Sequence, residues 1–161
     1  MSDATFEDGG YADRPLRLAV ETPDDLTVVS ALIQDAVGLT GEISWMPKRR
    51  RFVALVNRFR WEDRQAATRQ GRGFERVRSA LVVDGVRRVQ AMGLDPKEPE
   101  TVYSLLSAGF SAGEPPAGTI TLILAGDGEL ALEVEGLDLR LIDLTKPWAA
   151  PSGSAPDHDP E

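Results

Sequence analysis

The sequence predicts one α+β domain: a mainly antiparallel β-sheet of about nine strands, rolled or split into two layers, with one N-terminal amphipathic helix. Two patterns predict this fold. Apolar residues recur with helical spacing between residues 23 and 37, and they alternate with polar residues through most of the later segments. The chain has 161 residues, of which 42% are hydrophobic, so it is long enough to bury one core.

The first elements are a short strand and the helix. Leu16–Val20 alternates apolar and polar residues and is predicted to be a strand. Thr22 is a suitable N-cap, and Pro23 suits the first helical position, where no amide hydrogen bond is needed. The apolar spacing of three and four then predicts a helix over Pro23–Val37, which Gly38 ends.

Later segments have the two-residue period of strands. Ile43–Trp45 and Phe52–Phe59 are predicted to form a hairpin, and Arg60–Gly73 is predicted to be a long mobile loop because its apolar period is lost. Asp84-Gly85 predicts a second two-residue hairpin, because both turn residues of such a hairpin need positive φ. The remaining predicted strands are Thr101–Phe110, Thr119–Ala125, Leu130–Glu135 and Leu137–Leu144. The first of these has the weakest strand pattern, and the last three are predicted to form a meander. Trp148 is expected to pack back onto the sheet.

Both ends of the chain differ in composition from its body. Residues 1–14 hold four acidic residues and no apolar run, and residues 150–161 are rich in proline, so both are predicted to be disordered. The single folded domain is expected over residues 15–149. The pattern of a secretory signal or of a membrane-spanning segment is absent from the sequence, which predicts a cytoplasmic protein.

The residue types that are missing narrow the chemistry. The chain has no cysteine, which excludes disulfides, thiolate nucleophiles and zinc ribbons. Its single histidine, His158, lies in the proline-rich tail, so the folded body cannot supply the histidine of a Ser-His-Asp triad. We therefore expect no catalytic residue, no cofactor and no metal site, and we favour a protein that is not an enzyme.

Charge is distributed unevenly along the chain. The sequence has 18 basic and 26 acidic residues, for a net charge of −8, yet the segment 48–88 alone carries +9 and the rest carries −17. This basic segment includes Lys48–Arg51 at the predicted hairpin tip and arginines that alternate with aromatic residues between Asn57 and Trp61. Because arginine binds carboxylates and phosphates through a planar fork of donors, the segment indicates a contact surface for an anionic partner.

The hypothesis favoured here is a non-enzymatic binding module that contacts an acidic protein or a phosphate-bearing ligand. If the predicted hairpins share a face, their arginines form one exposed stripe; the residues expected in it are Arg51, Arg58, Arg60, Arg76 and Arg78. Nucleic acid is a less favoured partner, although exposed aromatic residues beside arginines are typical of single-strand binding. No membrane contact is expected. The simpler interpretation is that these arginines pair with carboxylates of the same chain or cover a solvated face.

Two further hypotheses belong to other classes of protein. One is an enzyme of unknown reaction with a cleft between the helix and the rolled sheet. The other is a structural homodimer that pairs through an exposed strand edge, for which Thr101–Phe110 is the expected edge.

Several segments carry a resemblance to a known family. They are DDLTVVSALIQDAV from residue 24, ISWMPKRRRF from residue 43, NRFRWE from residue 57, RVRSALVVDGV from residue 76, PAGTITLILAGDGE from residue 116 and DLTKPW from residue 143. With them the chain resembles a conserved proteobacterial family of unknown function over nearly its whole folded body. The resemblance implies a compact bacterial cytosolic protein and assigns no activity, substrate or cofactor.

Overall fold

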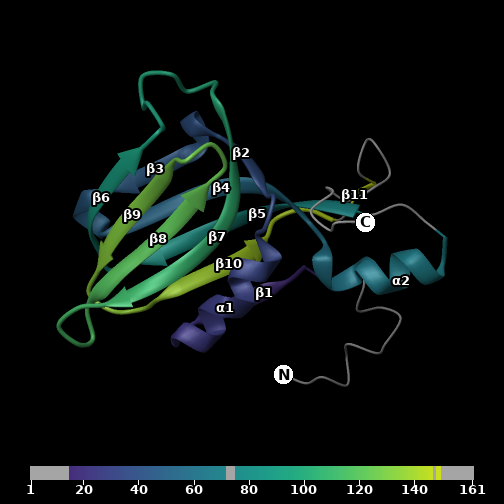
Figure 1. Cartoon of the computed structure of the whole chain (residues 1–161), viewed down its shortest axis with the longest axis horizontal. Helices are drawn as coiled ribbons and strands as arrows, with labels where there is room; N and C mark the ends of the chain where they lie inside the picture. Colours follow the sequence, from purple (N-terminus) through teal and green to yellow (C-terminus); the bar gives the residue numbers. More distant parts are fainter. Residues whose placement is uncertain (1–14, 72–74, 147, 150–161) are drawn as a thin grey trace.

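The computed structural model describes residues 15–71, 75–146 and 148–149 (Figure 1). Its strands are β1 (Arg17–Val20), β2 (Val37–Leu39), β3 (Ile43–Met46), β4 (Arg51–Phe59), β5 (Glu75–Asp84), β6 (Val86–Met92), β7 (Val102–Ala112), β8 (Gly118–Leu124), β9 (Glu129–Val134), β10 (Leu139–Asp143) and β11 (Trp148–Ala149). Its helices are α1 (Pro23–Leu32), α2 (Arg64–Arg69) and the short 3-10 helices η3 (Thr40–Glu42), η4 (Pro47–Arg49) and η5 (Trp61–Asp63). The regions predicted to be disordered at the two ends, with His158, lie outside the described residues.

The strands form one hydrogen-bonded sheet in the order β1-β10-β5-β4-β2-β7-β8-β9-β6, with β3 added to β4 and β11 added to β5. Every pairing is antiparallel. The prediction of a mainly antiparallel sheet is therefore confirmed, with eleven strands in the described part of the chain where about nine were expected from the apolar alternation.

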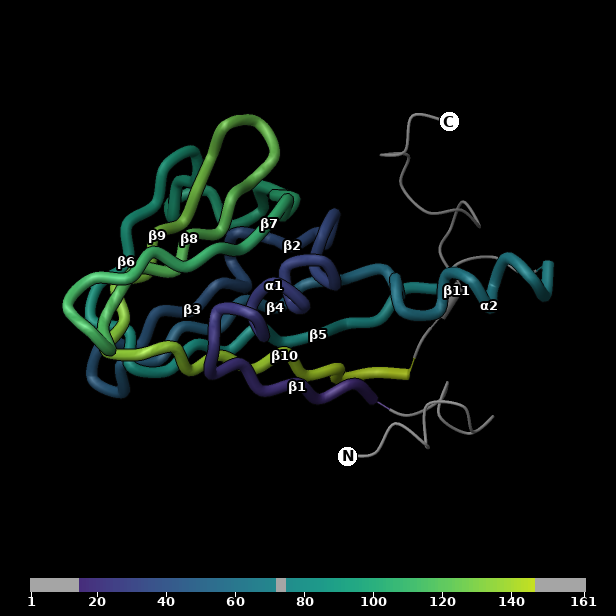
Figure 2. Tube along the Cα trace, turned by 60° about the horizontal axis from the view of Figure 1, so that its bottom comes forward, coloured from purple at the N-terminus to yellow at the C-terminus, as the bar shows by residue number. Residues whose placement is uncertain are grey.

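Side chains from both ends of this sheet share one core. Leu81 of β5 and Leu141 of β10 belong to the same buried cluster as Leu122 of β8 and Leu132 of β9. Figure 2 shows β6, β9, β8 and β7 on one side of the molecule and β3, β4, β5, β10 and β1 on the other. The sheet is thus one continuous path whose two halves bury their apolar residues together.

Helix α1 begins where the sequence predicts. The Thr22 hydroxyl accepts a hydrogen bond from the Asp25 amide, and the Asp25 carboxylate accepts one from the Thr22 amide, at 3.2 Å in both cases. The helix ends at Leu32 and not at Val37. The reason is that Asp35 adopts a left-handed conformation with φ 65° and donates its amide to Leu105 in β7, so pairing with the sheet replaces the last helical turn.

The hairpin predicted at Asp84-Gly85 is wrong. β5 pairs with β4 and β10, whereas β6 pairs with β9 at the far end of the sheet. Only Gly85 of the two turn residues has positive φ, at 73°, so the geometry of a two-residue hairpin is not met. Gly85 instead marks a corner at which the chain leaves one half of the sheet and enters the other.

Three other sequence predictions need correction. In the predicted meander, β8 and β9 pair as expected, but β10 lies between β1 and β5. The segment Thr101–Phe110 forms most of β7, which lies between β2 and β8, so it is not a sheet edge; the described edges of the main path are β1 and β6. The predicted loop Arg60–Gly73 contains η5 and α2. At Trp148 the backbone returns to the sheet, because β11 pairs with the start of β5.

Candidate functional site

The five arginines predicted to form one stripe lie on both faces of the sheet. Along β4, residues 52, 54, 56 and 58 alternate onto the buried face, so Arg58 continues the series begun by Phe52. In the register of β4 with β5, Arg78 is opposite Asn57 and Arg76 is opposite Phe59, which places both on the other face. The single stripe that the sequence predicts is therefore absent from these strands.

Arg58 is fully buried and all of its donors are used. Its side chain is 0% exposed. It donates to both carboxylate oxygens of Asp143 at 3.0 and 3.1 Å, to both carboxylate oxygens of Glu62 at 2.9 Å, and to the Phe59 carbonyl at 3.0 Å. A guanidinium has five N–H donors, so none remains for a molecule outside the fold. The prediction that Arg58 contacts a partner is corrected by this geometry.

The carboxylates keep the Arg58 guanidinium charged. Burial alone would lower the pKa of Arg58, but the hydrogen bonds and charges of Glu62 and Asp143 outweigh this effect and raise the pKa above its ordinary value. Asp143 is held in turn by the Ser79 hydroxyl at 2.7 Å and by the Leu16 amide at 3.0 Å. These contacts join β4, β5 and β10 to the residue that precedes β1, so the cluster stabilises the sheet.

Arg60 is also withdrawn from solvent, with a side chain that is 7% exposed. Its guanidinium pairs with Glu75, and it lies 3.5 Å from the Asp63 carboxylate. Its amide donates to the Glu75 carbonyl at 2.9 Å, which fixes the backbone where the chain leaves β4. Arg60 thus contributes to the fold and presents almost no surface to a partner.

Arg76 and Arg78 are partly exposed and each has an internal contact. The Arg76 guanidinium lies 4.0 Å from the centre of the Phe59 ring, a cation–π contact. Burial lowers the pKa of Arg76, and the charge of Asp35 opposes this shift. Arg78 pairs with Glu42 at 2.8 Å.

Arg51 is at the other end of β4, opposite Asp84 in β5. At ~3.3 Å per residue, the six-residue offset along β5 between Asp84 and Arg78 separates the Arg51 end of the sheet from Arg78 by roughly 20 Å. The Arg51 guanidinium donates to Asp84 at 2.7 Å, and Arg140 contacts the second oxygen of the same carboxylate at 3.1 Å. The Arg51 side chain is 40% exposed. Of the five predicted residues, it is the one that belongs to an exposed basic cluster.

We call this cluster the basic corner. Its members come from η4 and the residue that follows it, the start of β4, the start of β6 and β10, and they are Lys48, Arg49, Arg50, Arg51, Arg87, Arg88 and Arg140. The Val86 amide donates to the Arg50 carbonyl at 2.8 Å, which joins η4 to the start of β6. The acidic residues of the same corner are Asp84, Glu133, Glu135 and Asp138, so seven basic residues face four acidic ones.

The ion pairs of the basic corner are open to water. Arg50 and Arg87 share Glu135, and Arg88 lies 3.7 Å from Glu133. The side chains of Arg87 and Arg88 are 57% and 62% exposed, and ion pairs at such sites contribute little because water and salt screen them. Lys48 and Arg49 are exposed and make no ion pair with any described residue. The corner therefore presents guanidinium and ammonium donors that an outside anion can reach.

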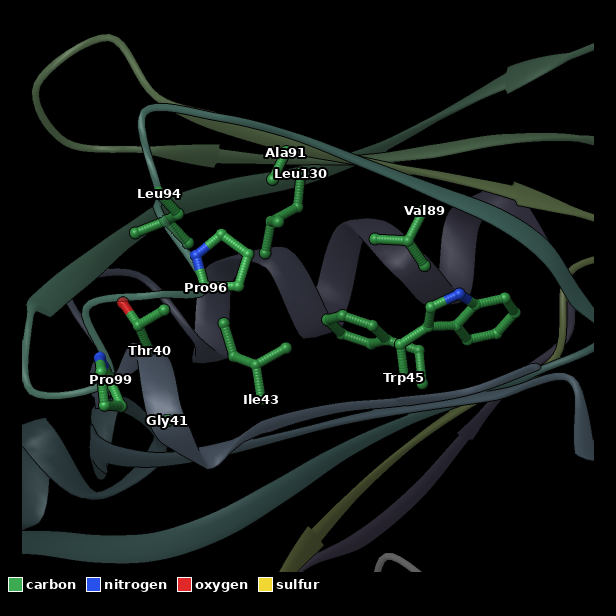
Figure 3. Close-up of a pocket in the computed structure, with 11 residues that line it drawn as sticks. Thr40, Gly41, Ile43, Trp45, Val89, Ala91, Leu94, Pro96, Pro99 and Leu130 are labelled. Atoms are coloured by element: carbon green, nitrogen blue, oxygen red, sulfur yellow. The ribbon is translucent and has the colours of Figure 1, made fainter.

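A separate apolar pocket lies between the two halves of the sheet (Figure 3). Its volume is about 760 Å³, and its lining consists of Thr40, Gly41, Ile43, Trp45, Phe52, Val89, Ala91, Leu94, Pro96, Pro99 and Leu130. None of these side chains is ionisable. Sequence reasoning missed the pocket because it joins β3 and β4 to β6, β9 and the 93–101 loop, and the order of the strands was not known.

A metal site, a cleft between helix and sheet, or a membrane-spanning helix would indicate another function. In the ranges that the structure describes, no three His, Cys, Asp or Glu residues are grouped in a way that could hold a metal ion. The large pocket has no lining residue from α1, so it is not the cleft between helix and sheet that the enzyme hypothesis expects. Among the described helices, none combines the length and apolar character needed to cross a membrane.

Comparison with known proteins agrees with the resemblance found in the sequence. A family model described as a protein of unknown function (DUF2948) matches residues 16–158, which is most of the chain. No curated protein and no solved structure matches the chain.

Proposed function

Since the chain belongs to the DUF2948 family of unknown function, we propose its function from its geometry: it is a non-enzymatic binding domain that contacts an anionic partner through the basic corner. The partner is an acidic protein or a phosphate-bearing ligand. The observation that carries the proposal is the meeting of exposed basic residues from η4 and from the start of β6, joined by the hydrogen bond between Val86 and Arg50.

The arginines differ in burial and in pairing, and this difference supports the proposal. Arg58 and Arg60 are buried with carboxylates, so their positive charge is used within the fold. In contrast, Arg87 and Arg88 are more than half exposed and pair only weakly. An incoming anion can take over such donors at little cost, because the internal pairs that it replaces are already solvated.

The proposal is tested with two immobilised probes, a poly-glutamate peptide and inorganic polyphosphate. The test variant changes Arg50, Arg51, Arg87 and Arg88 together to Gln. The control variant changes Arg17, Arg69, Lys97 and Lys146, which are exposed elsewhere, to Gln and so removes the same amount of charge. Retention is compared at about 0.01 M and about 1 M salt, where the screening length falls from about 30 to about 3 Å.

We expect the wild-type protein and the control variant to be retained at low salt on at least one probe and to be released at high salt. The corner variant should be lost from both probes while its circular dichroism stays unchanged. Retention on poly-glutamate alone identifies an acidic protein surface as the partner, and retention on polyphosphate alone identifies a phosphate ligand. Equal retention of the two variants, or retention of none of the three proteins, contradicts the proposal.

A further inference from the structure

The apolar pocket and the exposed cations of η4 lie on two sides of one side chain, Trp45. Trp45 lines the large pocket together with Ile43 and Val89. It also lines a shallow groove of about 520 Å³ that is completed by Met46, Pro47, Lys48 and Arg49. Figure 3 shows the indole of Trp45 at one end of the pocket, next to Val89, with Thr40 and Pro99 at the opposite end. An apolar space and a basic rim thus adjoin each other.

We propose that this pocket binds a small amphipathic carboxylate, with the apolar chain inside the pocket and the carboxylate against Lys48 and Arg49. This site shares Lys48 and Arg49 with the basic corner, whereas its apolar lining contains no residue of that surface. Its volume of about 760 Å³ lies within the range of roughly 300–1,000 Å³ that is usual for sites of small ligands.

The lining of the pocket accounts for the apolar part of the ligand. One wall is Ile43 and Phe52, and the facing wall is Val89 and Leu130. The one hydroxyl group, on Thr40, already donates to the Thr101 carbonyl at 3.0 Å. A polar ligand inside the pocket would therefore lose its hydrogen bonds to water without replacing them, whereas an alkyl chain loses nothing.

The rim accounts for the charged end of the ligand. Lys48 and Arg49 are exposed, and in the described ranges neither makes an ion pair. The indole N–H of Trp45 likewise has no hydrogen-bond acceptor among the described residues, so it offers a third donor at the same end of the pocket. Cationic and N–H donors beside an apolar space select an anion with an apolar tail, and they do not favour its neutral counterpart.

The test uses titration calorimetry on the full chain with hexanoate, octanoate and decanoate, and with decanol as the uncharged match of decanoate. Transfer of a methylene group from water into an apolar site should raise the affinity about fourfold for each carbon added. We expect decanoate to bind at least about tenfold more tightly than decanol, because a charge-assisted hydrogen bond is worth about that factor. Affinity that does not grow with chain length, or equal affinity for decanol and decanoate, overturns the proposal.

Two variants locate the site. Ala91→Trp fills the pocket from an exposed position on β6 and should weaken decanoate at least about tenfold, whereas Val28→Trp on the exposed side of α1 should leave it unchanged. If Ala91→Trp fails to fold, Leu94→Asp in the 93–101 loop places a charge in the lining and should have the same effect. Decanoate affinity that survives these changes overturns the proposal.

The double variant Lys48→Gln with Arg49→Gln distinguishes the contribution of the rim to binding from that of the apolar pocket. It should weaken decanoate about tenfold and leave decanol unchanged. Both pocket variants keep the arginines of the proposed contact surface, so retention on poly-glutamate or polyphosphate should be unaffected by Ala91→Trp. Loss of decanoate binding with retention intact, or the reverse, therefore shows which of the two proposals fails. An unchanged decanoate affinity in the double variant contradicts the assignment of the rim.

Discussion

The Arg58 guanidinium and the Asp143 carboxylate are joined by two parallel hydrogen bonds in the interior, from Nε to Oδ1 at 3.1 Å and from Nη2 to Oδ2 at 3.0 Å. Strand β5 lies between β4, which carries Arg58, and β10, which carries Asp143. The Ser79 hydroxyl of β5 donates to Oδ1 of Asp143 at 2.7 Å. The pair therefore spans three strands. Removing one member leaves the other charge buried without its main partner, which is much more costly than losing an exposed pair.

We predict that Arg58→Met lowers the free energy of unfolding by about 3–5 kcal/mol, because it leaves the buried Asp143 carboxylate without its cationic partner and also removes the pair with Glu62. Urea denaturation of the variant measures this change. The matched control is Arg51→Met at the partly exposed end of the same strand, where the loss should be below about 1 kcal/mol. An equal loss of unfolding free energy in the two variants would contradict the prediction that the buried cluster contributes more to stability than the exposed pair.

A second prediction concerns Tyr103, whose hydroxyl is buried and accepts or donates no hydrogen bond within the described residues. An unsatisfied buried hydroxyl costs free energy, so Tyr103→Phe should raise the free energy of unfolding at pH 7 by about 1 kcal/mol. Thermal denaturation of wild type and variant measures the difference. A lower stability of the variant would show that the hydroxyl has a partner such as an ordered water.

The pH dependence of the same residue gives a third prediction. Burial raises the pKa of Tyr103, and the negative charge of Glu42 adds to the shift. A raised pKa in the folded state means that the unfolded chain loses its proton first, so stability falls as the pH rises above the ordinary tyrosine pKa of about 10. Tyr103→Phe should make the stability curve flatter between about pH 10 and 11. Parallel curves for the two proteins would contradict the assignment.

Local features of the fold could be predicted from the sequence because their causes are local. The N-cap at Thr22 and the alternation along β4 depend on residues within a few positions of each other. The same period of two that predicts β4 also places residue 58 on the face of Phe52, and this signal indicates that Arg58 is buried. The usual exposure of arginine to water argues against this, but a buried arginine is acceptable when carboxylates such as Asp143 pair with it.

The order of the strands and the pocket could not be predicted in this way. Asp84-Gly85 has the composition of a hairpin turn, but the neighbours of β5 are β4 and β10. Residues 60–74 separate β4 from β5, and residues 85–138 separate β5 from β10. Whether β5 and β6 pair as a hairpin or enter different halves of the sheet depends on which pairing buries more apolar surface. The residues of a single turn do not determine this. The pocket depends on the same choice, because Phe52 and Leu130 meet only once the sheet is assembled.

A fourth prediction concerns the close approach of Tyr103 to Gly38. A Cβ atom at Gly38 would lie 2.6 Å from the Tyr103 hydroxyl oxygen and 3.0 Å from the Leu55 carbonyl oxygen. Gly38→Ala should therefore destabilise the protein by about 1–3 kcal/mol, the usual cost of overpacking. In the control Gly109→Ala no atom lies within 4 Å of the new methyl group, so the change should stay within about 0.5 kcal/mol. Denaturation midpoints compare the two, and an unchanged midpoint for Gly38→Ala would contradict the prediction.

The last prediction concerns the acid side of the stability curve. The amide of Glu21 and the Thr22 hydroxyl lower the pKa of Asp25 in the capping box. A lowered pKa in the folded state stabilises the protein above the ordinary aspartate pKa of about 4, and this contribution is lost as the pH falls through the folded value. Asp25→Asn should therefore lower stability at pH 7 and narrow its difference from wild type at about pH 3. The control Asp24→Asn also removes one acidic residue from the first helical turn but no contact of the Thr22 cap, so it should lower stability at pH 7 less than Asp25→Asn does. A difference for Asp25→Asn that persists at low pH would show that the side chain acts by a route other than its charge.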